Sequence, residues 1–133
     1  MDTNRVLNDW SDAAYGDKSF PDAAFIVEKG AEKDDKGKIL QKYRHLPHHT
    51  KSATDPMANG TVDLPHLRNA LARVNQVEPV KEAAVSFRKR AASHLQRHAK
   101  ALLESYKSKS VLTPEQQEFV GFCASVGITV EGE

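Results

Sequence analysis

The segment from Val80 to Lys107 constrains the fold more than any other part of this sequence. Placed on a helix at about 100° per residue, its apolar residues and one histidine gather in a band about 100° wide: Val80, Ala84, Phe87, Ala91, Leu95, His98, Leu102 and Tyr106. Five cations fall roughly opposite: Lys89, Arg90, Arg97, Lys100 and Lys107. The pattern predicts one long helix with a buried face and a cationic face in solvent.

Two helices are predicted before it from the residues at their ends. Thr3 is placed to cap a first helix that runs to about Tyr15. Asp63 is placed to cap a second helix through its carboxylate, with Pro65 in the first turn. The second helix has a buried stripe at helical spacing: Leu64, Leu67, Leu71 and Val74.

A last helix is predicted near the end of the sequence. Thr113 and Gln116 have the spacing of a capping box, and Pro114 between them suits the first helical position. Gly127 indicates where this helix ends.

The region between the first two helices has weaker signals. Two short apolar runs, 25–27 and 39–40, are separated by a polar stretch with glycine at both ends. A loose β-hairpin and a long loop both fit this pattern. Residues 50–62 are rich in turn formers and are expected to be a loop.

These patterns predict a single small domain over residues 1–133, since domains most often have about 100–150 residues. We expect an N-terminal helix in 1–19, an irregular or hairpin segment in 20–62 and a helical core in 63–133. The expected class is mainly α: a compact bundle of about four helices, with the irregular or weak β-hairpin segment between helices one and two.

Composition narrows the class of protein further. No apolar run approaches the roughly 18 residues of a membrane span, so we expect no membrane partner. The first ten residues lack the apolar region of a secretory signal. The single cysteine, Cys123, lies in an apolar stretch and is interpreted as a small core residue in a reducing compartment. A cytoplasmic protein is expected.

Charge is distributed unevenly along the chain, although the total is only +1. Residues 1–35 hold nine acids and four bases, a net −5, and residues 110–133 hold four acids and no base, a net −4. Residues 36–109 therefore hold fifteen bases and five acids, a net +10. Such a block favours a polyanionic partner, although cations that simply solvate helix surfaces would give the same count.

The sequence lacks the motifs of common catalytic sites. There is no G-x-S-x-G turn, no Walker A sequence and no G-x-G-x-x-G. The stretch 33–37, Lys-Asp-Asp-Lys-Gly, does not match the Lys-x-Asp-Gly adenylation motif of nucleotidyltransferases. Cys123 has apolar neighbours, which disfavour a reactive thiolate. We therefore expect a non-catalytic binding domain without a cofactor.

All six histidines lie in the basic block. His94 and His98 are one helical turn apart, and His45, His48 and His49 could complete a zinc site with them. No C-x-x-C or H-E-x-x-H accompanies them. The sequence therefore favours hydrogen-bonded core histidines, and we predict no metal site. A zinc-stabilised structural domain is the weaker alternative.

Clustered cations and amides on helices are the features that bind a sugar–phosphate backbone. Most aromatic residues lie on apolar stripes, so stacking on single-stranded bases has little support. We expect contacts to duplex DNA with little sequence preference. The predicted DNA-binding residues are Lys42, Arg44, His48, His49, Lys51, Arg68, Asn69, Arg73, Arg88, Lys89, Arg90, Arg97 and Lys100.

Three stretches form a familiar ordered set. They are F-P-D-x-A-F at 20–25, Y-R-H-L-P-H-H at 43–49 and V-D-L-P-H-L-R-N-A-L-A-R at 62–73. Over about residues 20–105 the chain resembles a small helical module that recurs in bacteriophage and bacterial proteins. The whole chain also resembles the N-terminal DNA-binding domain of phage-type ATP-dependent DNA ligases.

The ligase resemblance implies a domain that holds nicked double-stranded DNA while a tethered catalytic core seals the break, a role in DNA repair. It implies a monomer fused to that core, with any ligase chemistry outside these residues. The alternative is a protein-interaction module of a phage head or structural protein, whose basic face meets an acidic partner or packaged DNA.

Overall fold

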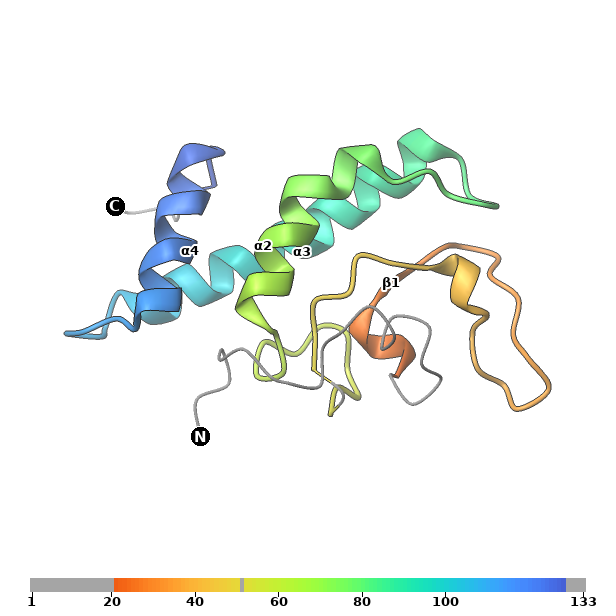
Figure 1. Ribbon diagram of the computed structural model, residues 1–133, viewed down its shortest axis with the longest axis horizontal. Coiled ribbons are helices and arrows are strands. Elements are labelled where there is room, and N and C mark those ends of the chain that lie inside the picture. The colour runs from red at the N-terminus through yellow and green to blue at the C-terminus, as the bar shows by residue number, and fades with distance from the viewer. Residues whose placement is uncertain (1–20, 51, 129–133) are drawn as a thin grey trace.

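The computed structural model describes residues 21–50 and 52–128. In this part of the chain there are three α-helices: α2 (Leu64–Arg73), α3 (Ala84–Tyr106) and α4 (Pro114–Ser125). In Figure 1, α2 lies against α3, α4 stands beside α2, and the segment that precedes α2 lies along one side of the helices. The mainly helical class is confirmed for these residues. The predicted helix from Thr3 to Tyr15 lies outside the described residues.

The segment before α2 is a small hairpin with long connections. Strand β1 (Ile26–Val27) pairs antiparallel with β2 (Arg44–His45), with Ile26 opposite His45. Single-turn 3-10 helices at Asp22–Ala24 and Gln41–Tyr43 precede the two strands. Of the two alternatives that the sequence left open, the structure has the hairpin, and its second strand is Arg44–His45 and not the apolar run at 39–40. Ile39 makes only an isolated bridge to Lys33 within the connection.

Buried side chains from the three helices and the hairpin form one core. Phe87, Ala91 and Leu95 are fully buried on the predicted face of α3, and Leu67 and Phe119 meet them from α2 and α4. Cys123 is buried in the same core, as predicted.

Helix α3 begins at Ala84, four residues later than the pattern suggested. The backbone N–H groups of Val80, Lys81 and Glu82 donate to the carboxylate of Glu28, at 2.6 to 2.9 Å. Val80 is therefore exposed and outside the helix, and its assignment to the buried face is wrong.

The start of α4 agrees with the sequence, whereas the predicted cap of α2 by the carboxylate of Asp63 is wrong. Thr113 and Gln116 form the predicted capping box, with Pro114 in the first turn of α4. Asp63 is the N-cap of α2, but its side chain accepts no hydrogen bond from the helix backbone. Its Oδ2 atom instead lies 3.0 Å from Nδ1 of His66.

Leu46, directly after β2, has a φ of 53° and is the one non-glycine residue with a positive φ in the described ranges. Its carbonyl oxygen accepts a hydrogen bond from Nδ1 of His48 at 2.8 Å. Among the described residues no helix has the length and apolar character that crossing a membrane requires.

Candidate functional site

The exposed side of α3 carries the best-defined group of exposed polar side chains, of which Arg97 also contacts Sδ of Met57 at 3.9 Å. Five residues, which we call the α3 surface, line a shallow hollow of about 430 Å³ together with Ala92: Lys89, Ser93, Gln96, Arg97 and Lys100. At about 100° per residue they lie on the side of the helix opposite Phe87, Ala91 and Leu95. The helix therefore presents them to solvent while its other face is held in the core.

The α3 surface combines three cations with a hydroxyl and an amide, and no carboxylate lines its hollow. Glu104 follows one turn after Lys100 and lies 3.7 Å from Nζ of Lys107. Among the residues predicted from the sequence, Lys89, Arg97 and Lys100 belong to this surface. Ser93 and Gln96 were missed, although their spacing from Lys89 places them on the same helical face.

Arg88 and Arg90 also lie on α3 but are engaged within the protein. Nη2 of Arg88 lies 3.1 Å from Glu78, and its Nε donates to the carbonyl of Val77 at 2.9 Å. Nη2 of Arg90 lies 2.6 Å from Oε1 of Glu82. These partners of both arginines lie in the loop before α3. The helical periodicity of the sequence does not predict the path of that loop. Both guanidinium groups therefore have partners within the protein, and their contact with DNA stays a prediction.

Three further predicted contacts lie in the interior, so the expectation that they face DNA is corrected. Arg44 is 8% exposed and lies over the ring of Phe25, with its guanidinium carbon 4.0 Å from the ring centre. His48 and His49 are fully buried. None of the three can reach a phosphate in this conformation.

The remaining predicted residues are dispersed. Lys42 is exposed, with Nζ 5.2 Å from the ring centre of Tyr43. Arg68, Asn69 and Arg73 are exposed on α2. Arg68 shares a small hollow with Glu115 and Glu118 of α4, so acidic groups lie near it. Lys51 lies outside the described residues. The predicted cations thus do not all gather on one surface.

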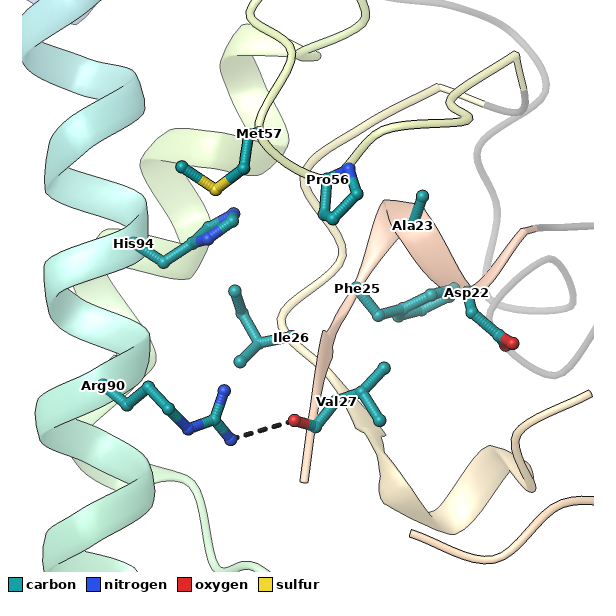
Figure 2. A pocket seen from close by; sticks show the side chains of 9 residues that line it. All are labelled: Asp22, Ala23, Phe25, Ile26, Val27, Pro56, Met57, Arg90 and His94. Atoms are coloured by element: carbon teal, nitrogen blue, oxygen red, sulfur yellow. Dashed lines mark hydrogen bonds between the residues drawn. The ribbon is translucent and has the colours of Figure 1, made fainter. Parts of the chain in front are cut away.

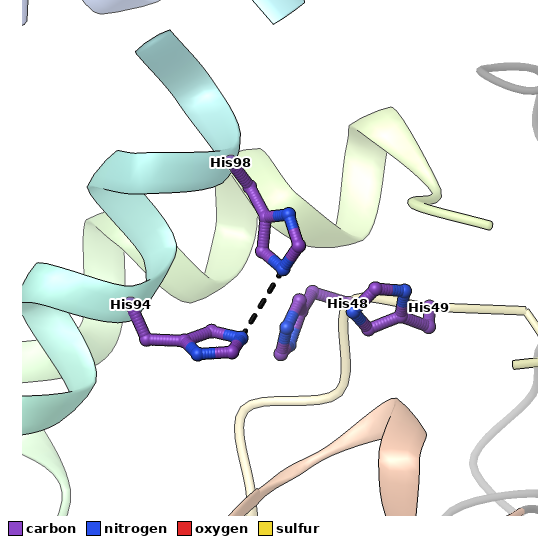
Figure 3. Close-up of side chains that lie close together, drawn as sticks. All are labelled: His48, His49, His94 and His98. Carbon is purple, nitrogen blue, oxygen red and sulfur yellow. Dashed lines mark hydrogen bonds between the residues drawn. The ribbon is translucent and has the colours of Figure 1, made fainter. Parts of the chain in front are cut away.

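The second feature is the histidine cluster, which consists of His48, His49, His94 and His98. Figure 3 shows the four rings converging from α3 and from the segment between β2 and α2. One ring nitrogen from each residue lies within 4.8 Å of those from the other three. Nε2 of His94 and Nε2 of His98 are 3.1 Å apart.

Hydrogen bonds orient the rings of the histidine cluster. Nδ1 of His98 lies 2.8 Å from Oδ1 of Asn59, and Nδ1 of His49 lies 2.9 Å from Oγ1 of Thr61. The carbonyl oxygen of Pro56 lies 2.9 Å from Nε2 of His98 and 3.1 Å from Nε2 of His49. The predicted hydrogen bonds to core histidines are therefore present. The ring nitrogens of four histidines also lie close together, as the weaker alternative of a zinc site requires. His45 lies outside the group and contacts Glu28.

The cluster consists of neutral imidazoles at neutral pH. Burial, together with the nearby His98, lowers the pKa of His49 and of His94 to about 4. Burial also lowers the pKa of His48 well below its usual value and lowers that of His98. Neutral imidazoles offer ring nitrogen lone pairs, either to hydrogen-bond donors or to a metal ion.

A pocket of about 400 Å³ opens beside the cluster. Phe25, Ile26 and Met57 give it apolar walls, and His94 and Pro56 line the side next to the histidine cluster (Figure 2). Arg90 and Val27 also line the pocket, and Nη2 of Arg90 donates to the carbonyl of Val27 at 2.9 Å (Figure 2).

Comparisons of the chain with protein-family models, with curated proteins and with solved structures found no match.

Proposed function

We propose that this chain is a non-catalytic module that binds double-stranded DNA through the phosphate backbone, with little dependence on sequence. The observation that carries the proposal is the α3 surface, where three cations, a hydroxyl and an amide lie on one rigid helical face. Lysine and arginine side chains attract phosphate oxygens, and serine and glutamine add neutral hydrogen bonds to the backbone.

The geometry supports modest affinity. The α3 surface holds three cations, whereas the full predicted set would suggest six to eight phosphate contacts. Each neutralised phosphate contributes about −0.9 to the slope of log affinity against log salt. The expected slope is therefore about −3, not the −5 to −7 of the larger set.

The resemblance to ligase DNA-binding domains extends the proposal to a biological setting. A weak, non-specific module fused to a DNA ligase catalytic core would raise the concentration of that core near nicked DNA. In this setting the module needs no group that touches the break, and the parent enzyme supplies all of the chemistry.

The test is a fluorescence anisotropy titration of a labelled nicked duplex and of the matching intact duplex, between about 50 and 200 mM salt. We expect binding to both, with affinity that falls as salt rises. The double variant Lys89→Glu/Lys100→Glu should weaken binding to each duplex at least tenfold, because it turns the end cations of the α3 surface into anions.

The matched control is Lys33→Glu/Lys36→Glu, which changes the net charge equally but lies in the connection between β1 and β2. It should bind nearly as the unsubstituted chain does. Equal losses of DNA affinity in the two variants would show that binding responds only to net charge. This result would refute the proposal that the α3 surface is the DNA-binding site. An absence of any binding at low salt would refute the proposal and favour an acidic protein partner.

A further inference from the structure

The histidine cluster contains one buried nitrogen that has no hydrogen-bond partner among the described residues. His48 is fully buried, and its Nδ1 donates to the carbonyl of Leu46 at 2.8 Å. A neutral imidazole carries one proton, so this bond fixes Nε2 as the unprotonated nitrogen. Nε2 of His48 is buried without a partner, and leaving an acceptor in that state is unfavourable.

The rings of His98 and His49 share one part of this arrangement, an oxygen atom beside Nδ1. Oδ1 of Asn59 lies beside Nδ1 of His98, and Oγ1 of Thr61 lies beside Nδ1 of His49. Histidines that bind metals commonly donate one ring N–H to such an oxygen while the other nitrogen binds the ion. If both Nδ1 atoms carry the proton, Nε2 of His98 and of His49 face the Pro56 carbonyl without one. A cation bound to both Nε2 atoms would occupy their lone pairs and so remove the repulsion with the carbonyl oxygen.

From this geometry we infer that His48, His49, His94 and His98 form a binding site for a divalent transition metal ion of the zinc type, coordinated through their Nε2 atoms. The inference reverses the expectation of no metal site drawn from the sequence. It is independent of the proposed DNA binding, because none of the four ligands belongs to the α3 surface.

The distances suit such an ion after a small contraction. Zinc binds imidazole nitrogen at about 2.0 Å, which puts neighbouring nitrogens about 3.3 Å apart in a tetrahedron. The pair from His94 and His98 is already 3.1 Å apart. The widest pair, at no more than 4.8 Å, must shorten by about 1.5 Å, a movement that rotation of the imidazole rings can supply.

The ligand chemistry selects the class of metal and the kind of site. Imidazole nitrogen suits zinc, copper, nickel and iron, whereas calcium and magnesium need oxygen ligands. Four protein ligands leave no open position, which is typical of a structural site. Asp55 acts electrostatically on His49 and His98 and supplies compensating negative charge. The pocket lined by His94 gives the ion an entry path.

The first experiment uses the full chain, purified, stripped with a chelator and titrated with zinc chloride. We expect one zinc ion per chain and a rise in melting temperature of at least about 5 °C. Titration with cobalt(II) should give the visible absorption of a tetrahedral site. X-ray absorption at the zinc edge should show four nitrogen ligands at about 2.0 Å.

His94→Gln tests the assignment, because His94 is the least buried ligand and its replacement disturbs the core least. It should weaken zinc binding about 100-fold or more, a loss beyond that of supporting groups around metal sites. The matched control is His66→Gln, which removes a half-buried histidine outside the cluster and should leave zinc binding unchanged.

Absence of tetrahedral cobalt absorption, together with a melting temperature that neither zinc nor chelator changes, would overturn the inference. In that case the histidine cluster would be a hydrogen-bonded part of the core without a metal ion. Equal zinc binding by His94→Gln and the unsubstituted chain would overturn the four-histidine assignment. If His94→Gln does not fold, the ligand count from X-ray absorption of the unsubstituted chain decides the question.

Discussion

Arg90 and Glu82 form an ion pair that fastens the start of α3, with Nη2 of Arg90 2.6 Å from Oε1 of Glu82. The same guanidinium donates to the carbonyl of Val27 in β1, so one side chain links the long helix to the hairpin. An arginine that the sequence predicts as a DNA contact thus has two structural partners within the protein.

Replacement of Arg90 tests this assignment. Arg90→Met keeps much of the side-chain stem but removes the guanidinium, and it should lower the free energy of unfolding by about 2 kcal/mol. Urea denaturation measures the loss. Lys89→Met, at the adjacent exposed position, should change stability by less than about 0.5 kcal/mol yet weaken DNA binding more than Arg90→Met does. A larger loss of DNA binding in Arg90→Met than in Lys89→Met would show that Arg90 belongs to the DNA-binding surface.

Glu28 is a second structural anchor, because its buried carboxylate accepts from three backbone N–H groups and contacts Nε2 of His45. Glu28→Gln keeps the shape but replaces one acceptor oxygen by an NH₂ donor that faces other donors. We expect a loss of about 3 kcal/mol in the free energy of unfolding. Glu104→Gln, on an exposed carboxylate of α3, serves as the control and should be nearly neutral. A loss of the same size at both positions would contradict the role of Glu28.

The pH dependence of that contribution has a definite sign. Burial raises the pKa of Glu28, but the hydrogen bonds from His45, Val80, Glu82 and Lys81 outweigh it and bring the pKa down from 4.5 to about 2. A carboxyl with a lowered pKa stabilises the fold above its unfolded value, and this contribution is lost as pH falls through the folded value. The stability difference between the unsubstituted chain and Glu28→Gln should therefore be constant above pH 4.5 and shrink towards pH 2. A difference that grows as pH falls would contradict this assignment.

The capping box at the start of α4 gives a local test. Oγ1 of Thr113 accepts from the N–H of Gln116 at 3.1 Å, and Gln116 Oε1 accepts from the N–H of Thr113 at 3.1 Å. Thr113→Ala removes the first bond and should cost about 1 kcal/mol in unfolding free energy. Ser110→Ala, in the exposed connection before α4, should cost much less. Thermal and urea unfolding of the two variants would show whether the losses differ.

Cys123 should be chemically inert in the folded protein. It is 1% exposed, and burial raises the pKa of its thiol to about 11. Since the thiolate is the reactive form, a thiol-specific reagent at neutral pH should react slowly with the native chain and quickly in denaturant. Equal rates in the two conditions would show that the C-terminal helix opens readily.

Local signals in the sequence predicted the helices well. The capping box at Thr113, the stripe through Phe87, Ala91 and Leu95, and the start of α2 after Asp63 are confirmed. Such features depend on neighbours within a few residues. The start of α3 was wrong because its preceding N–H groups bond to Glu28, more than fifty residues earlier in the chain. No local pattern records that contact.

The candidate sites were predicted less completely for the same reason. Helical spacing predicts that Lys89 and Lys100 share a face, but it cannot show that Arg88 and Arg90 meet carboxylates from the preceding loop. The pair His94 and His98 is evident from its spacing. The contact of these two residues with His48 and His49 depends on the path of the segment after β2. The sequence pattern does not predict that path.

That path begins with the left-handed backbone at Leu46, two residues before the first histidine of the cluster. The left-handed conformation raises the free energy of a non-glycine residue by about 1 kcal/mol. The packing around Leu46 must therefore hold its backbone in this conformation. Because Leu46 also fixes the ring of His48 through its carbonyl, the folded chain carries this cost before any ion arrives. The backbone that leads to His48 is thus already in place, so an ion that binds the proposed site needs to move the imidazole rings and not this turn.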